Sequence, residues 1–287
     1  MPKFSTCLWF NNEAEAAANL YINAFEDGQQ GKVSYYVDDE HKPKGSVLTV
    51  EFTLGEIEFM ALNGGPEFTF TPAISFFVDC ETEEQLQKLW NTLVLEGKVL
   101  MPLDQYPFSE KFGWLEDCFG VSWQLNLTGK KQCITPTLMF SNQKYGKAEE
   151  AMNHWLSIFG DGKIEGIQKN EDGTIMQAAF TLRGQPFRVM DSAGKHDFDF
   201  TMATSFCVYC ENQEEIDRIW AEVTAKGKEW PCGWMEDQYG VYWQIATRDM
   251  NTLIDYSDPV RANRVMQALY KMKKIDIATL RDAYNNK

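Results

Sequence analysis

Histidine is almost absent from this sequence. Its 287 residues contain three, and no two of them are close in sequence: His41, His154 and His196. Histidine is the commonest protein ligand of transition metals, and catalytic zinc sites are built largely from it. We therefore expect no metal centre built from histidines.

Basic runs and long apolar runs are also missing. Asp and Glu number 42 against 27 Lys and Arg, which gives a formal net charge of −15 and a pI near 4.7. A protein that binds nucleic acid needs a basic face for the phosphates, so we expect no nucleic-acid partner. No stretch approaches the roughly 18 consecutive apolar residues that span a bilayer, and Met1–Ser5 shows no apolar leader segment. We expect a cytoplasmic protein without a membrane partner.

The seven cysteines are scattered and odd in number, which is typical of free thiols in a reducing compartment. Cys207 and Cys210 form a C-x-x-C pattern within a stretch that is typical of a strand. Side chains three positions apart on a strand point to opposite faces. We therefore expect this pair to form neither a disulfide nor a metal site.

What the sequence does contain is a long internal repeat. The stretch Gly113–Leu125 returns as Gly233–Ile245 with eight of thirteen positions identical, and Ile74–Trp90 aligns without a gap on Thr204–Trp220. Repeats of solenoid proteins span roughly 20–50 residues, so a longer one indicates tandem domains. We predict a first domain over residues 1–130, a second over 131–250 and a helical tail over 251–287.

Each copy divides into two modules of the order β-α-β-β-β. The first module is predicted to contain a helix over Glu13–Phe25, capped by Asn12, and three strands over 32–37, 46–54 and 56–62. The second contains a helix from Glu83 to Leu95, capped by Thr82, and its strands include a short one at Val99–Met101. Copy one also has about ten extra residues, Met101–Glu110, predicted to form a loop. Two tail helices are predicted: one starts at Ser257-Asp258-Pro259 and runs to about Lys274, and a short one is capped by Asp276 and runs to Tyr284.

Four stretches of copy one resemble the PhnB-like family, also named after 3-demethylubiquinone methyltransferase. They are Phe76–Cys80, Leu100–Asp104, Pro107–Trp114 and Phe119–Leu125. This family belongs to the vicinal oxygen chelate superfamily, which includes glyoxalase I, extradiol dioxygenases and bleomycin-resistance proteins. The resemblance implies an α+β fold of paired β-α-β-β-β modules whose mixed sheets curl around a shared cavity.

The resemblance does not by itself imply a metal site or a methyl transfer. Enzymes of the superfamily hold a divalent metal with His, Gln and Glu on strands that face the cavity. Here the first strands of the four modules contain no histidine, and Gln124 and Gln244 stand where a ligating Glu would be expected. We expect no metal cofactor, with a divalent metal as the alternative. S-adenosylmethionine-dependent transfer ordinarily needs a glycine-rich turn in a doubly wound sheet, which this sequence lacks.

A cavity with aromatic walls and a few polar anchors remains as the predicted site. Its candidate residues in copy one are Trp9, Tyr106, Phe108, Ser109, Trp114, Trp123 and Gln124. The counterparts in copy two are Trp234, Trp243 and Gln244. The loop around Pro107 is predicted to cover the mouth, and plain core packing is the alternative for Trp123 and Trp243.

Three functions are compatible with these residues. The first is binding of a small aromatic or vicinal-oxygen molecule without a metal site of the superfamily type. The second is a metal-dependent lyase, isomerase or dioxygenase, and the third is a scaffold without catalysis. Whether the chain is an enzyme stays open, and it is expected to be either a monomer whose two domains mimic a dimer or a homodimer.

Overall fold

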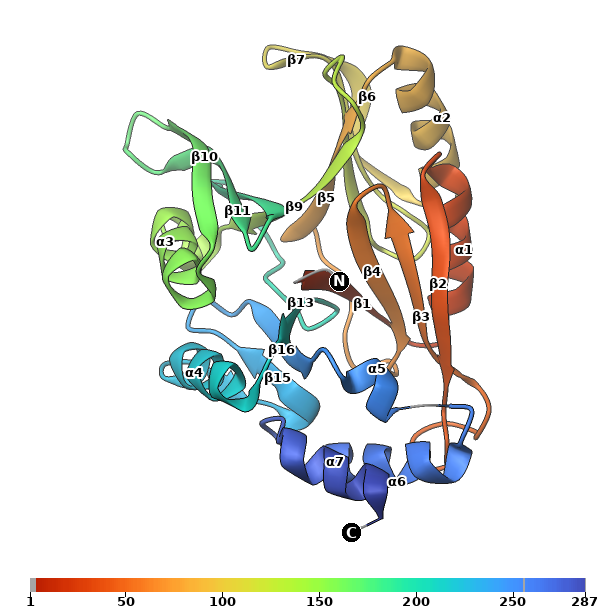
Figure 1. The fold of residues 1–287 in the computed structure, drawn as a ribbon. Coiled ribbons are helices and arrows are strands. Elements are labelled where there is room, and N and C mark those ends of the chain that lie inside the picture. The colour runs from red at the N-terminus through yellow and green to blue at the C-terminus, as the bar shows by residue number, and fades with distance from the viewer. Residues whose placement is uncertain (1–3, 255, 287) are drawn as a thin grey trace.

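The computed structural model describes residues 4–254 and 256–286 of the chain (Figure 1). Residues 1–3, which belong to the predicted first domain and to the stretch Met1–Ser5, lie outside the described residues.

Four modules repeat one order of elements, as the sequence predicts. The first comprises β1 (Phe4–Phe10), α1 (Ala14–Ala24), β2 (Gly28–Tyr35), β3 (Val47–Leu54) and β4 (Ile57–Asn63). The second comprises β5 (Ile74–Cys80), α2 (Glu83–Leu93), β6 (Lys98–Tyr106), β7 (Ser109–Glu116) and β8 (Ser122–Leu127). The third comprises β9 (Cys133–Phe140), the short η1 (Asn142–Lys144), α3 (Ala148–Phe159), β10 (Gly162–Lys169), β11 (Ile175–Leu182) and β12 (Gln185–Asp191).

The fourth module and the tail complete the chain. The fourth comprises β13 (Thr204–Cys210), α4 (Gln213–Thr224), β14 (Lys228–Glu229), the short η2 (Pro231–Gly233), β15 (Trp234–Glu236) and β16 (Tyr242–Thr247). The tail comprises α5 (Met250–Leu253), α6 (Pro259–Tyr270) and α7 (Ile277–Asn285). No helix in the described part of the chain has the length and hydropathy needed to span a bilayer.

The strands form two eight-stranded mixed sheets. Sheet A has the order β14-β15-β16-β13-β1-β4-β3-β2, and sheet B has the order β10-β11-β12-β9-β5-β8-β7-β6. At the centre of sheet A, β1 pairs antiparallel with β13, and at the centre of sheet B, β5 pairs antiparallel with β9. Each sheet therefore joins one module of copy one to one module of copy two. The predicted glyoxalase-like fold with a helical tail is confirmed, whereas this pairing across the copies is a feature that the repeat did not reveal.

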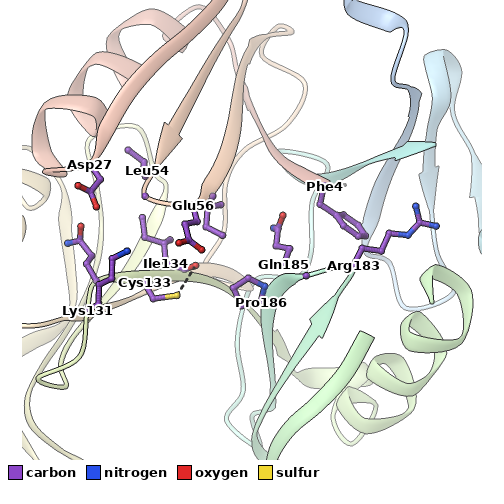
Figure 2. Close-up of a pocket in the computed structure, with 14 residues that line it drawn as sticks. Phe4, Asp27, Leu54, Glu56, Lys131, Cys133, Ile134, Arg183, Gln185 and Pro186 are labelled. Atoms are coloured by element: carbon purple, nitrogen blue, oxygen red, sulfur yellow. Dashed lines mark hydrogen bonds between the residues drawn. The ribbon is translucent and has the colours of Figure 1, made fainter. Parts of the chain in front are cut away.

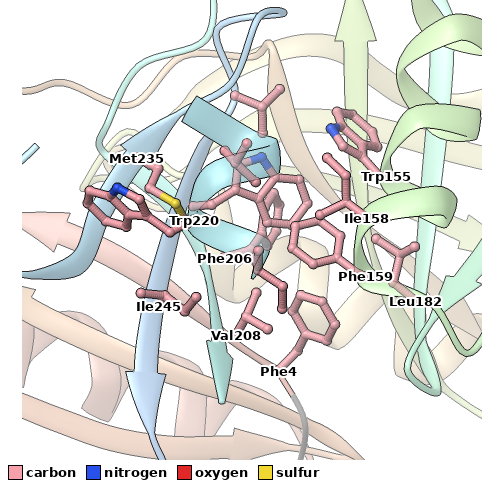
Figure 3. Close-up of a cluster of buried hydrophobic side chains, with 14 of the residues drawn as sticks. Phe4, Trp155, Ile158, Phe159, Leu182, Phe206, Val208, Trp220, Met235 and Ile245 are labelled. Atoms are coloured by element: carbon pink, nitrogen blue, oxygen red, sulfur yellow. The ribbon is translucent and has the colours of Figure 1, made fainter. Parts of the chain in front are cut away.

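The two large hydrophobic cores follow the sequence copies rather than the sheets. One core packs α1 and α2 against the strands of copy one, and the other packs α3, α4 and the tail against the strands of copy two. Figure 1 shows α1 and α2 together on one side of the molecule and α3 on the other. Phe4 of β1 crosses into the core of copy two (Figure 3), where its ring lies 5.6 Å from that of Phe159. The copies are thus joined by packing as well as by strand pairing.

A buried carboxylate connects the two modules of copy one. Asp117, which is 3% exposed, follows β7. Its Oδ2 accepts hydrogen bonds from the Tyr21 hydroxyl (2.7 Å) and from Trp123 Nε1 (2.9 Å). Its Oδ1 accepts from the backbone N–H groups of Phe119 and Val121. The same side chain therefore shapes the turn before β8 and holds α1 against it.

Copy two repeats this arrangement with a different donor. Asp237 Oδ2 accepts from Trp155 Nε1 of α3 (2.7 Å) and from Trp243 Nε1 (2.9 Å). Its Oδ1 accepts from the backbone N–H groups of Tyr239 and Val241. The aspartate recurs in both copies because it shapes the turn before the last strand and also binds a helix of the other module.

Two local predictions need correction. Asn12 does not cap α1, because the first helical N–H, that of Ala14, donates to Asn63 Oδ1 at the end of β4 (2.9 Å). The extra residues of copy one form a β-hairpin of β6 and β7 rather than a loop, so the predicted strand at Val99–Met101 is too short. Pro102 is tolerated because β6 is an edge strand and because the register shifts between Met101 and Asp104, and such shifts absorb the extra residues.

Other local predictions are confirmed. Thr82, Asp258 and Asp276 accept backbone N–H bonds at the first turns of α2, α6 and α7. All seven cysteines are free thiols. Cys207 and Cys210 lie on β13 and face opposite sides: Cys210 belongs to the core of copy two, whereas Cys207 lines a cavity.

Replacing either buried aspartate should destabilise the fold. In Asp117→Asn and Asp237→Asn the amide keeps one acceptor for the backbone but cannot accept from both side-chain donors. We expect each to lower the free energy of unfolding by about 2–4 kcal/mol, because buried donors lose their acceptor. Urea denaturation followed by circular dichroism measures the change.

Glu116→Gln is the matched control for Asp117→Asn. Glu116 lies next to Asp117 but pairs only with the exposed Lys98, at 3.5 Å, and such surface pairs contribute about 0–1 kcal/mol. Equal losses in Asp117→Asn and Glu116→Gln would contradict the role that we assign to the buried aspartates.

Candidate ligand-binding cavity

The concave face of sheet A is built by strand alternation. On β1 the side chains of Cys7 and Trp9 point to this face, and the register places Cys7 opposite Met60 of β4 and Ser205 of β13. On β16, Gln244 lies beside Cys207 of β13. Because β1 and β13 occupy the centre of the sheet, residues of both sequence copies share one floor.

The tail lies over this floor and forms one wall of a partly open cavity of about 360 Å³. Six tail residues contribute to the lining: Met250, Ile254, Tyr256, Met266, Leu269 and Tyr270. Backbone N–H groups of η2 anchor the tail by donating to the carbonyls of Met272 (2.9 Å) and Lys273 (2.6 Å). On the far side, Gln267 donates to Asp38 and Glu40 of the first module, so α6 bridges the two edges of the sheet.

One end of the cavity is aromatic. The rings of Trp9 and Trp234 meet edge to face at 5.7 Å, and Trp9 Nε1 donates to the carbonyl of Gly65 (2.9 Å). Gly64 lines the cavity beside them, and a Cβ at this position would lie only 2.2 Å from the Trp9 ring. Glycine at position 64 is therefore what allows the Trp9 ring to lie flat against the chain.

The centre of the floor carries small polar groups that are already paired. Gln244 Nε2 donates to Ser205 Oγ (3.0 Å). Burial raises the pKa of the Cys7 thiol to about 12 and also raises the pKa of Cys207 well above its ordinary value. Both thiols stay protonated at neutral pH, so neither acts as a thiolate nucleophile.

The other end of the cavity is polar. Glu51 of β3 and Tyr209 of β13 line it, and the Tyr209 hydroxyl lies 3.1 Å from Ser5 Oγ. Burial raises the pKa of Glu51, and the charge of nearby Lys32 opposes this increase. The Lys32 ammonium is held by the tail, since it donates to the Ile254 carbonyl and lies over the Tyr256 ring.

The concave face of sheet B is different in character. Gln124 Nε2 donates to Ser75 Oγ (2.7 Å), which matches the pair in sheet A. Arg188 stacks on Phe77, with 3.8 Å between the guanidinium carbon and the ring centroid, and pairs with Asp79 at 3.2 Å. The tail lies over sheet A, at the bottom of Figure 1, whereas the β6–β7 hairpin extends sheet B at the top.

The structure divides the candidate residues of copy one and their counterparts in copy two among three places: the cavity of sheet A, the side of sheet B, and the hydrophobic cores. Trp9, Trp234 and Gln244 meet in the sheet A cavity. Five belong to sheet B or its hairpin: Tyr106, Phe108, Ser109, Trp114 and Gln124.

The remaining two are buried in the cores. Trp123 and Trp243 are 0% and 1% exposed, on the opposite faces of their strands, where they bind Asp117 and Asp237. The cavity prediction is corrected for these two residues. Tyr106 and Phe108 also stack on each other at the exposed hairpin rather than covering the mouth of the sheet A cavity.

Sequence reasoning missed the polar end of the cavity and the tail. Glu51 gave a usable signal, because it is the one charged residue in the strand Val47–Leu54. The tail residues gave none, since their helical spacing indicates burial without saying what they cover.

The residues of the two concave faces do not fit the divalent metal of the superfamily. The central positions of sheet A hold Cys7, Met60, Ser205 and Gln244, and those of sheet B hold Ser75, Phe77, Gln124 and Arg188. Catalytic zinc needs about three His, Cys or carboxylate ligands. In the described ranges 4–254 and 256–286, no group of three or more His, Cys, Asp or Glu residues could hold a metal.

A hollow of about 440 Å³ also lies between the copies, away from the floor of sheet A (Figure 2). The β3–β4 turn, the linker between the copies and the β11–β12 turn form its walls, with exposed Glu56 and Lys131 among its residues. Strands hold side chains in place better than turns do. We therefore take the cavity of sheet A, rather than this hollow, as the candidate site.

Comparison with known proteins agrees with this architecture. No curated protein matches the sequence. A PhnB protein from Bacillus cereus is 44% identical over 43% of this chain and 98% of its own, with a TM-score of 0.41. A protein from Staphylococcus aureus is 37% identical over 44% of this chain and 97% of its own, with a TM-score of 0.19. Glyoxalase I from Zea mays is 9% identical over 84% of this chain and 92% of its own, with a TM-score of 0.56, which is a likeness of fold alone.

The profile of the family described as 3-demethylubiquinone-9 3-methyltransferase matches residues 2–126 and again residues 132–246. These two matches cover the four modules and leave the tail outside. The chain therefore belongs to this PhnB-type family, with the family domain present twice in tandem.

Proposed function

We propose that this protein binds a small, largely aromatic molecule in the tail-covered cavity of sheet A, without a metal site of the superfamily type. The observation that carries the proposal is the cavity itself, because its volume of about 360 Å³ is in the range of small-molecule pockets. Its walls come from both copies, and its aromatic and polar ends are separate.

The lining suits a planar apolar guest. The rings of Trp9, Trp234 and Tyr270 offer both faces and edges for contact, and aromatic pairs gain most from offset or edge-to-face geometry. Met60 and Met266 add flexible thioether side chains that adapt to the shape of a ligand. The polar groups at the other end would fix the orientation of the guest.

Two enzymatic readings of the family have less support. A metal-dependent lyase, isomerase or dioxygenase requires ligands that the floor of neither sheet supplies. Transfer of a methyl group from S-adenosylmethionine ordinarily uses a doubly wound sheet with a glycine-rich turn, and the sheets here have a different strand order. The scaffold reading gives no reason for a tail that lines an aromatic cavity.

Location and assembly follow from the same features. Seven free thiols suit a reducing compartment, and we place the protein in the cytoplasm. The two copies already pair through the central strands of both sheets, as two subunits of a dimer would. We therefore favour a monomer with domains 1–130 and 131–250 over a further dimer.

Filling the cavity should weaken binding. Ala246 lines it on β16, and Ala246→Phe adds a ring to the space without removing a contact. We expect the fluorescent probe N-phenyl-1-naphthylamine to bind the wild type at one molecule per chain, and the substitution to weaken its affinity by about tenfold or more. Fluorescence titration measures both, and circular dichroism checks the fold.

The internal repeat supplies the control for this experiment. Asn126 holds the position on β8 that Ala246 holds on β16, so Asn126→Phe adds the same ring to sheet B. The probe should bind this variant as it binds the wild type. If Asn126→Phe lost binding and Ala246→Phe kept it, the ligand would bind at sheet B, and our proposal would be wrong.

Metal should make no difference to the protein. After incubation with Zn²⁺, Ni²⁺ or Mn²⁺ and desalting, we expect no stoichiometric metal by elemental analysis, because no three His, Cys, Asp or Glu residues of the described part of the chain form a group that could hold a metal. A chelator should leave the melting temperature unchanged. One retained metal per chain that disappears in Gln244→Ala would support the metal-dependent alternative instead.

A further inference from the structure

Glu51 stands where two hollows of sheet A meet. The tail-covered cavity of about 360 Å³ and a neighbouring hollow of about 240 Å³ share three lining residues, Glu51, Met60 and Tyr209. The second hollow has no tail residue in its lining and continues along the strands toward Glu58 and Arg248. The two together form one elongated site whose aromatic part lies under the tail and whose middle is marked by a carboxylate.

The position of Glu51 on the floor is fixed by its strand. On β3 it lies opposite Met60 of β4, and Thr53 lies opposite Glu58, so both glutamates point to the same face on adjacent strands. Burial is the main cause that raises the pKa of each, and the charge of Glu51 raises that of Glu58 further. A cation that approaches a buried carboxylate from the cavity stabilises the ionised form of that carboxylate.

The cations beside these carboxylates have contacts of their own. Arg248 pairs with Glu211 at 3.2 Å, on the outer side of the second hollow. Lys32 lies near Glu51, but its ammonium donates to the Ile254 carbonyl and lies 5.3 Å from the centre of the Tyr256 ring. Both basic groups therefore line the hollows together with Glu51, and each also contacts a residue other than Glu51.

We propose that the natural ligand is an aromatic amine, with its ring between Trp9, Trp234 and the tail and its protonated nitrogen at Glu51. This inference rests on the proposed binding function and adds the chemical class of the ligand. A carboxylate accepts hydrogen bonds from an ammonium group and repels a carboxylate, so the site selects by charge as well as by shape. The Tyr209 hydroxyl offers a second acceptor next to Glu51.

Three probes with one ring system separate shape from charge: naphthalen-1-ylmethanamine, naphthalen-1-ylmethanol and 1-naphthoate. Displacement of N-phenyl-1-naphthylamine at pH 7 gives the affinity of each. We expect the amine to bind about tenfold more tightly than the alcohol and the naphthoate to bind most weakly. Glu51→Gln should remove the advantage of the amine and leave the affinity of the alcohol unchanged.

Glu56→Gln is the control, because Glu56 is exposed and lies outside both hollows of sheet A. It should preserve the order of affinities, and the melting temperatures of both variants show that they fold. Equal binding of amine and alcohol by the wild type, or an unchanged preference in Glu51→Gln, would overturn the ligand class while binding itself stands. Binding of none of the probes would overturn the proposed function as well.

Discussion

The antiparallel pairing of β1 with β13 is the interaction on which the rest of the structure depends. It places the first module beside the last one, and it brings Cys7, Ser205 and Gln244 onto one floor. The tail follows the last module and therefore lies over that same floor. Without this pairing Trp9 and Trp234 would belong to different sheets, and the cavity would have neither an aromatic end nor a cover.

Cores and sheets divide the chain in different ways, and together they make one body. The cores hold the two modules of a copy together, with the aspartate bonds to Tyr21 and Trp155 as polar links between them. The sheets join modules of different copies. Any movement of one copy relative to the other must therefore break a row of backbone hydrogen bonds at the centre of both sheets.

The repeat and the local signals predict the modules, most helix caps and the superfamily fold. They do not predict which modules pair, because pairing within a copy and pairing across copies bury the same strand faces. The grouping of Trp9 with the aromatic residues of the hairpin is wrong for that reason. Another error was avoidable: Trp123 and Gln124 are neighbours on a strand and must point to opposite faces, so they could not line one cavity.

The central place of β1 also has a consequence for synthesis. Sheet B is complete once residue 191 has left the ribosome, whereas Phe4 finds its partner Val208 only when the fourth module emerges. Until then β1 presents an unpaired edge beside a finished neighbour, which is the kind of edge that recruits strands from other chains. Sheet A can therefore close only after synthesis has passed β13, so its assembly is necessarily later than that of sheet B.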